Sequence, residues 1–130
     1  MGARTPLTMI LVDTGIWVDH FKRANVRLVE LLAEERVVTH DVIIGELALG
    51  GIPDRENTLF FLDLLPRLTF LPAKAVRDFI ERQRLVGSGI GYSDAHLLAS
   101  AQAHGTRLWT VDRRLAACVG RLALTLPHSP

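Results

Sequence analysis

The sequence places four acidic residues beside or inside strongly apolar segments, and these are Asp13, Glu46, Asp94 and Asp112. Unpaired carboxylates are costly to place next to an apolar core. Carboxylates gathered in one place also repel one another, by roughly 4 kcal/mol for two unit charges about 4 Å apart at an effective dielectric constant near 20. A bound divalent cation would convert this repulsion into binding energy. A metal-dependent site is therefore the leading interpretation of the pattern.

The chemistry expected of such a site is attack by water rather than by a side chain. Hard oxygen donors suit Mg²⁺ or Mn²⁺, and one or two such ions bridge phosphate oxygens and activate a water molecule. The sequence has no Gly-x-Ser-x-Gly elbow and no Gly-x-x-x-x-Gly-Lys-Ser/Thr phosphate loop. Cys118, the only cysteine, has no evident catalytic partner.

Short apolar runs alternate along the chain with longer helical patterns. Strands are predicted at 8–12, 36–39, 68–71, 107–111 and 122–126, and helices at 14–21, 26–35, 41–49, 53–65, 72–86, 93–104 and 113–119. The strand segments are continuously apolar, which is typical of a parallel sheet covered on both faces. We predict one α/β domain over residues 1–130, with frayed ends at about 1–7 and 127–130.

This order of elements brings the four acids toward one place. Asp13 and Asp112 each follow a predicted strand, and ligands of open α/β sheets bind at the carboxyl ends of strands. Asp94 lies in the first turn of its predicted helix and shares a face with apolar residues three, four and seven positions later. Glu46 shares its face with Val42, Ile43 and Leu49, so it too is expected to point toward the core.

Each acid also has a purely structural interpretation. Asp13, Asp94 and Asp112 are all well placed to cap helices, with Ser93 as an alternative cap beside Asp94, and Asp41 reads as an ordinary cap. Glu46 is the hardest to explain in this way.

The polar residues near the acids have two interpretations each. Thr14 and Thr110 flank the expected cleft. We expect them either to bind water, metal or phosphate, or only to cap backbone groups. Arg113 and Arg114 follow Asp112 and either contact RNA phosphates or neutralise the acidic pocket.

Composition sets the remaining expectations. The 130 residues are 48% hydrophobic and 22% charged, which is ordinary for a globular protein, and the net charge of +1 provides no strong field toward nucleic acid. The first eight residues are too short and polar for a signal peptide, and no apolar run approaches the ~20 residues of a membrane span. We expect a cytoplasmic protein without a membrane partner.

The segments around the four acids resemble the PIN-domain ribonucleases, and within them the VapC-type toxins of bacterial toxin–antitoxin pairs. The resemblance runs from Met9 to about Leu126 and is most specific between Gly89 and Ala99; the matching segments are 12–17, 44–47, 91–99 and 108–112. Many relatives have serine after the Asp-Thr pair, where this chain has Gly15.

The resemblance implies a three-layer α/β/α sandwich with a central, mainly parallel sheet. It implies Mg²⁺- or Mn²⁺-dependent endonucleolytic cleavage of RNA, with Asp13 and Asp94 as the main metal ligands and Glu46 and Asp112 completing the catalytic pocket. The implied partners are an RNA substrate such as transfer RNA, a cognate antitoxin that blocks the cleft, and a second copy of the chain.

Two other function classes compete with this one. A non-catalytic PIN-like module would bind RNA or a protein, although the presence of all four acids argues against a degenerate site. An aspartyl-phosphate phosphatase would need a second acid two residues after its nucleophile, and position 15 is glycine.

Overall fold

A computed structural model describes residues 7–127 of the chain, which form three strands and seven helices. The central strand β1 (Ile10–Val12) pairs in parallel with β2 (Val37–Val38) on one side and with β3 (Arg107–Trp109) on the other. All of β1 is buried, with exposed fractions of 1% or less. This burial on both faces confirms the predicted covered parallel sheet.

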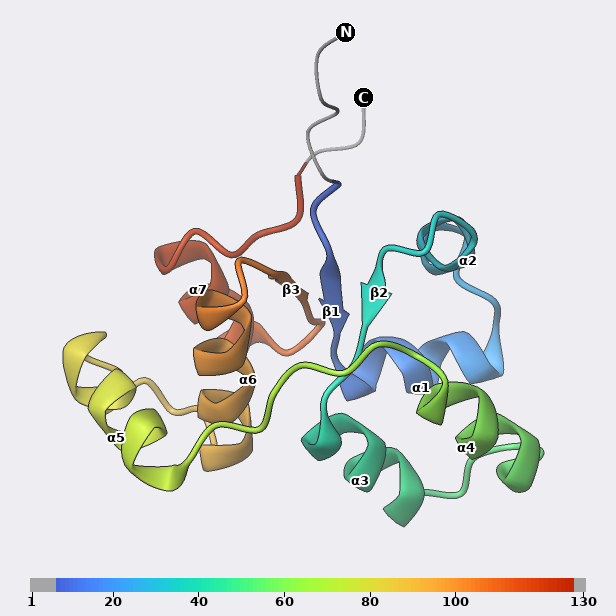
Figure 1. The fold of residues 1–130 in the computed structure, drawn as a ribbon, viewed down its shortest axis with the longest axis horizontal. Helices are drawn as coiled ribbons and strands as arrows, with labels where there is room; N and C mark the ends of the chain where they lie inside the picture. The colour runs from blue at the N-terminus through green and yellow to red at the C-terminus, as the bar shows by residue number, and fades with distance from the viewer. Residues whose placement is uncertain (1–6, 128–130) are drawn as a thin grey trace, which may run out of the picture.

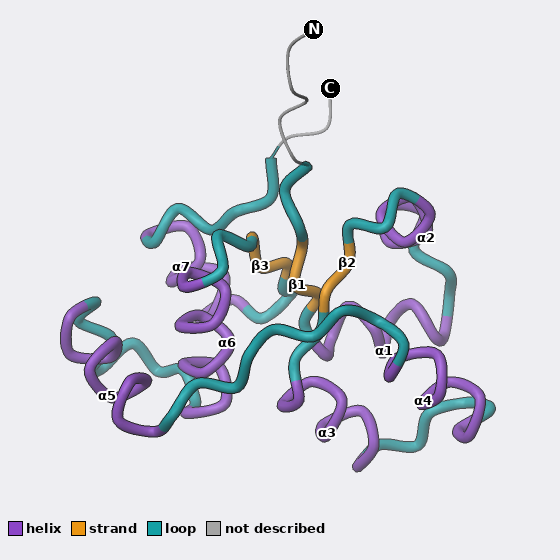
Figure 2. Tube along the Cα trace, in the orientation of Figure 1, coloured by secondary structure: helices purple, strands orange, loops and turns teal. Residues whose placement is uncertain are grey.

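The helices surround this small sheet on two sides. They are α1 (Thr14–Lys22), α2 (Val26–Ala33), α3 (Asp41–Leu49), α4 (Arg55–Asp63), α5 (Ala73–Arg82), α6 (Tyr92–Ala103) and α7 (Arg113–Arg121). Helices α5 to α7 lie on one side of the strands and α1 to α4 on the other (Figure 1). The result is the expected three-layer α/β/α sandwich. Its short strands lie at the centre of a mainly helical molecule (Figure 2).

Two of the predicted strands are wrong. Residues 68–71 form no strand, and the only pairing nearby is an isolated parallel bridge between Thr39 and Arg67. Residues 122–126 form no strand either, although the Leu108 N–H donates to the Leu124 carbonyl at 2.9 Å. In both segments a buried leucine, Leu68 or Leu124, joins the core. Each segment buries only this one leucine, and Phe70 is 51% exposed, so the apolar runs overestimated burial as well as strand pairing.

Several predicted helix boundaries also differ from the structure, and three of them have a clear physical reason. Helix α5 ends at Arg82 rather than at residue 86, and Arg84 then adopts a left-handed conformation with φ of 55° that no helix continues through. Helix α3 is capped by His40, whose Nδ1 accepts from the Val42 N–H at 3.0 Å, so Asp41 is its first residue rather than its cap. Helix α6 begins after Gly91, which leaves Ser93 and Asp94 inside its first turn.

The fold places the carboxyl ends of the strands next to the starts of the helices that carry the acids. Helix α1 begins directly after β1, while α6 contacts both β3 and α3. Among residues 7–127, no helix has the length and apolar character needed to cross a lipid bilayer. The predicted fraying falls largely on residues 1–6 and 128–130, which lie outside the described part of the chain.

Candidate active site

Asp13 is fixed at the junction between the central strand and the first helix. It follows Val12 of β1 and is the N-cap of α1, where its Oδ1 accepts from the Thr14 N–H at 2.8 Å. Its Oδ2 accepts from the Thr110 hydroxyl at 2.7 Å. With 8% of its surface exposed, Asp13 is buried, and hydrogen bonds to both oxygens offset the cost of burying its charge.

Glu46 reaches the same place from helix α3. Its Oε1 accepts from the Thr14 hydroxyl at 2.8 Å, so Thr14 links this carboxylate to the Asp13 cap. The prediction that Glu46 points into the core is wrong, because Glu46 is exposed and Leu49 on the same predicted face is 91% exposed. Only Ile43 and Leu47 of α3 are buried.

Asp94 is half-buried in the first turn of α6. The residues three, four and seven positions later, Leu97, Leu98 and Ala101, are fully buried, as the sequence predicts. Burial, followed by the negative charge of Asp13, raises the pKa of Asp94 from 3.8 to about 6, and the charges of Asp112 and Glu46 add to this rise. The carboxyl group therefore senses all three of the other acids.

Asp112 completes the group from the segment that follows β3, the parallel neighbour of β1. It lies three residues beyond the end of β3 and caps α7, with its Oδ1 accepting from the Leu115 N–H at 2.9 Å. Its own N–H donates to the Thr110 hydroxyl at 3.0 Å. The Thr110 hydroxyl thus joins Asp112 to Asp13, and the capping interpretation is correct for both acids.

All four acids line one cavity of about 390 Å³, which we call the acidic pocket; its lining residues are Asp13, Thr14, Gly15, Glu46, Asp94, Val111 and Asp112. The structure therefore brings together every carboxylate that the sequence singled out. No basic side chain of the described residues is part of this lining. Within residues 7–127, no group of three or more histidine, cysteine or acidic side chains is gathered tightly enough to hold a metal ion in the observed conformation.

Comparison with known proteins decides the family. The sequence profile of the PIN domain matches residues 10–119. This chain belongs to the PIN-domain family. It is 46% identical over 112 residues to proteins named Ribonuclease VapC32 from two strains of Mycobacterium tuberculosis, CDC 1551 / Oshkosh and H37Rv, with 85% of this chain and 90% of each relative covered.

Solved structures of lower sequence identity share the fold of this PIN domain. The structure of FitAB bound to an IR36 DNA fragment superposes with a TM-score of 0.60 at 23% identity, covering 86% of this chain and 91% of that chain. FitAcB from Neisseria gonorrhoeae superposes with a TM-score of 0.56 at 22% identity, covering 86% and 94%.

The arginines that follow Asp112 are not part of the acidic-pocket lining of this PIN domain. Arg113 and Arg114 line a separate cavity of about 490 Å³, which we call the arginine pocket; its lining residues are Arg84, Val86, Gly87, Ser88, Arg113, Arg114, Ala117, Cys118 and Arg121. None of the ion pairs among the described residues joins an arginine of this pocket to an acid. The structure thus offers no support for the idea that Arg113 and Arg114 neutralise the acidic pocket.

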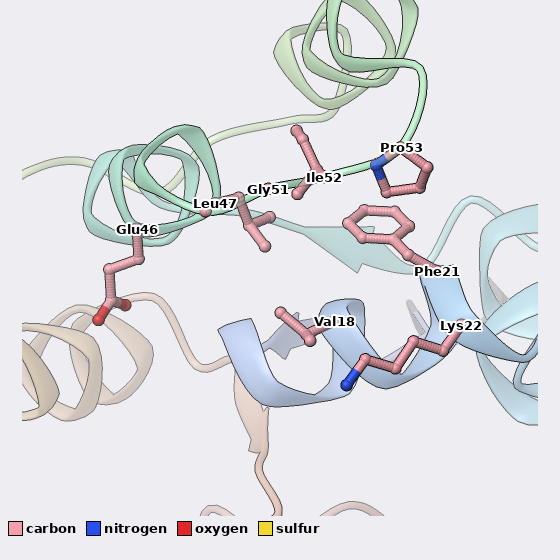
Figure 3. A pocket seen from close by; sticks show the side chains of 9 residues that line it. Val18, Phe21, Lys22, Glu46, Leu47, Gly51, Ile52 and Pro53 are labelled. Carbon is pink, nitrogen blue, oxygen red and sulfur yellow. The ribbon is translucent and has the colours of Figure 1, made fainter.

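An apolar cavity of about 400 Å³ adjoins the acidic pocket between α1, α3 and the segment that follows α3. Figure 3 shows Val18, Phe21, Leu47 and Ile52 gathered around it, while the Glu46 side chain extends away from Phe21 and Ile52. Glu46 lines both cavities, so the two are neighbours in this PIN domain.

Sequence reasoning missed the connecting role of the threonines and the reason for Gly15. The hydroxyls of Thr14 and Thr110 donate to the Glu46 and Asp13 carboxylates, which lie 32 and 97 positions away in the sequence, so no local spacing predicts these bonds. A Cβ atom at Gly15 would lie 2.9 Å from the Val111 Cγ2, so Val111 occupies the space that a side chain at position 15 needs.

Proposed function

We propose that this PIN domain is a metal-dependent endoribonuclease and the toxin of a toxin–antitoxin pair. The observation that carries the proposal is the acidic pocket, in which four carboxylates from four separate segments surround one cavity without a basic residue in its lining. The name Ribonuclease VapC32, borne by relatives that are 46% identical over most of both chains, supports RNA as the substrate.

The acidic pocket fits a divalent cation by the chemistry of its donors. Its charged groups are carboxylates only, and these hard oxygen donors suit Mg²⁺ or Mn²⁺. Asp13 and Asp94 would be the main ligands, with Glu46 and Asp112 completing the site. A bound cation supplies a Lewis acid for the phosphodiester and makes the attacking water more acidic.

The chain's own residues orient the carboxylates before any ligand arrives. Thr14 and Thr110 donate to Glu46 and Asp13, and these bonds fix the side chains that face the cavity. Asp94 has a pKa of about 6 and therefore exchanges a proton near neutral pH. Binding of a cation beside Asp94 would favour its ionised form.

The test is RNA cleavage by the purified chain with and without Mg²⁺ or Mn²⁺, using an end-labelled pool of RNA that includes transfer RNA. Asp13→Asn and Asp94→Asn are compared with Asp19→Asn, which changes an exposed acid of α1 outside the pocket. We expect metal-dependent cleavage by the unmodified chain and by Asp19→Asn, and its loss in the other two variants. Circular dichroism checks that each variant is folded.

Two outcomes would contradict the proposal. Equal cleavage by all four proteins would place the activity elsewhere or in a contaminant. RNA binding without cleavage, in the presence of either metal, would favour a non-catalytic PIN-like module instead.

The same proposal includes an antitoxin that covers the cleft, a homodimer and a cytoplasmic location. Apolar surface supports a protein partner, because Phe60, Phe61 and Leu64 of the α4 region are 67%, 44% and 69% exposed. Co-expression with a short open reading frame encoded just upstream should give a complex that co-purifies with the chain and suppresses its cleavage. Size-exclusion chromatography with light scattering measures the oligomeric state with and without that partner.

A further inference from the structure

The arginine pocket gathers four positive charges from two segments that are far apart in the sequence. Arg84 comes from the turn after α5, Arg113 and Arg114 from the first turn of α7, and Arg121 from its last turn. All four residues are exposed. Water and salt screen the repulsion between exposed guanidinium groups, and an anion in the cavity would be attracted to all four of them.

Arg113 and Arg114 lie in the first turn of α7, where a positive charge is unfavourable. The start of a helix carries a partial positive charge, which favours acids and disfavours cations. Helix α7 has no acidic residue in its first turn and has Arg113 and Arg114 there instead. Arg84 takes a left-handed conformation, but Glu35 and Ala123 do the same after α2 and α7, so this conformation reflects the end of α5 rather than a ligand. The placement of Arg113 and Arg114 against local stability suggests a ligand-binding role.

The other arginine contacts hold the pocket in shape. The Arg121 Nη1 donates to the Gln83 carbonyl at 2.8 Å, and the Arg114 Nη1 is 3.4 Å from the Gly89 carbonyl. These contacts fasten both ends of the segment from residue 83 to residue 89 against α7. Arg84 and Arg113 make no side-chain hydrogen bond or ion pair within residues 7–127, so their donors are available to a ligand.

The two charged pockets adjoin through consecutive residues. Asp112 lines the acidic pocket, while Arg113 and Arg114 line the arginine pocket. Successive Cα atoms are about 3.8 Å apart across a trans peptide, and the described chain has no cis peptide bond. A nucleic-acid strand with one phosphate at the carboxylates would therefore carry a neighbouring phosphate toward the arginines.

We propose that the arginine pocket binds the phosphate backbone of single-stranded RNA on one side of the cleavage site, with Arg84 and Arg113 as its principal phosphate contacts. This inference rests on the proposed nuclease function for its choice of ligand. Arginine matches phosphate geometry through paired N–H donors, and such contacts position a strand without reading its sequence. The pocket would thus set the direction in which RNA crosses the acidic pocket.

The experiment measures RNA binding without cleavage. A short fluorescein-labelled single-stranded RNA is titrated by fluorescence anisotropy in EDTA at several salt concentrations. The double variant Arg84→Gln/Arg113→Gln is compared with Arg23→Gln/Arg77→Gln, which removes two exposed arginines outside this pocket and so has the same net charge. A phosphate contact to a single strand contributes about −0.7 to the slope of log K against log salt concentration. We expect the first double variant to lose about 1.4 of this slope and the second to keep it.

Several outcomes would overturn the inference. Equal loss of slope in both double variants would mean a general charge effect, and an unchanged slope in the first would mean that the pocket does not contact phosphate. A polyglutamate peptide that binds more tightly than RNA and depends on the same arginines would identify an acidic protein segment as the ligand. Arginine-dependent RNA binding by a chain that never cuts RNA would instead overturn the nuclease proposal and leave this inference standing.

Discussion

The acidic pocket and the arginine pocket are lined by consecutive residues, Asp112 and Arg113, but they hold their charges in different ways. In the acidic pocket Asp13, Glu46 and Asp112 each accept a hydrogen bond from a neighbouring N–H or hydroxyl, and Asp13 accepts two. In the arginine pocket Arg84 and Arg113 have no such partner among the described residues. The fold therefore fixes its negative groups for a compact ligand and leaves its positive groups able to follow a flexible one.

The prediction with the largest expected effect removes the Thr110 hydroxyl, which joins the Asp13 carboxylate to the backbone N–H of Asp112. Thr110→Val deletes the donor to Asp13 and the acceptor of the Asp112 N–H at nearly constant volume. We expect metal-dependent RNA cleavage to fall about 10- to 100-fold, as is usual when the group that orients a metal ligand is lost. Thr110→Ser should restore most of the activity.

Thr125→Val is the control, since Thr125 is exposed and remote from the acidic-pocket lining. An equal loss of cleavage in both valine variants would show that the Thr110 hydroxyl does not orient the acids.

The second test uses the pH dependence of stability. The pKa of Asp94 rises from 3.8 in its ordinary state to about 6 in the folded chain, so between these values the folded state binds more protons than the unfolded state. Without metal, Asp94 therefore contributes most to the stability of the folded chain below about pH 4, and this contribution is lost as the pH rises through about 6. Asp94→Asn should raise the unfolding temperature in EDTA more at about pH 8 than at about pH 4.

Thermal unfolding followed by circular dichroism at both pH values measures the effect. The same difference between variant and unmodified chain at both values would mean that the Asp94 carboxyl group is not destabilised by burial and by its acidic neighbours.

The third prediction distinguishes the effect of backbone strain on stability from the effect of the Arg114 position on RNA binding. Gly87 and Gly89 both have a left-handed backbone, with φ of 78° and 83°, so alanine at either should cost about 1 kcal/mol of unfolding free energy. Only at Gly89 would the new Cβ meet a side chain, 2.9 Å from the Arg114 Cδ, whereas nothing lies within 4 Å at Gly87. Gly89→Ala alone should therefore displace Arg114 and weaken RNA binding.

Urea unfolding and RNA anisotropy applied to both variants distinguish the two contributions. If Gly87→Ala weakens RNA binding as much as Gly89→Ala does, the position of Arg114 is unimportant for the arginine pocket.

The smallest test concerns the residue after the Asp-Thr pair. Gly15→Ser should change the unfolding free energy by less than about 0.5 kcal/mol, because the better helix propensity of serine is offset by crowding against Val111. In the double variant Gly15→Ser/Val111→Ala the crowding is removed. Urea unfolding should then show the stabilisation that serine gives to the helix. A large loss of stability that Val111→Ala does not relieve would contradict this account.

Residues next to strong local signals were predictable from the sequence. The apolar run before Asp13 and the run before Asp112 mark strands, and a parallel sheet brings their carboxyl ends to one edge. Asp94 opens a helix whose residues 95–101 are all buried, so the inward position predicted for its apolar neighbours was confirmed without a distinct apolar face. Helix α3 is apolar on several sides, so the pattern did not show which side faces the core, and the orientation of Glu46 was predicted wrongly.

Features that depend on the path of a loop were not predictable. The arginine pocket forms because the turn at Arg84 packs against α7, where Arg121 donates to the Gln83 carbonyl. No periodicity in the sequence indicates that contact. The failed strands at 68–71 and 122–126 have the same origin, since each is a loop or turn in which a single leucine is buried, and an apolar run does not distinguish this from a strand.

The two roles of Asp13 affect how this chain could lose its activity during evolution. A change at Asp13 removes the cap of α1 and the partner of Thr110 together, whereas a change at exposed Glu46 removes a single bond to the Thr14 hydroxyl. Inactivation at Glu46 therefore leaves the fold nearly intact. Natural copies of this protein that have lost activity but still fold should carry their first inactivating substitution at position 46 rather than at position 13.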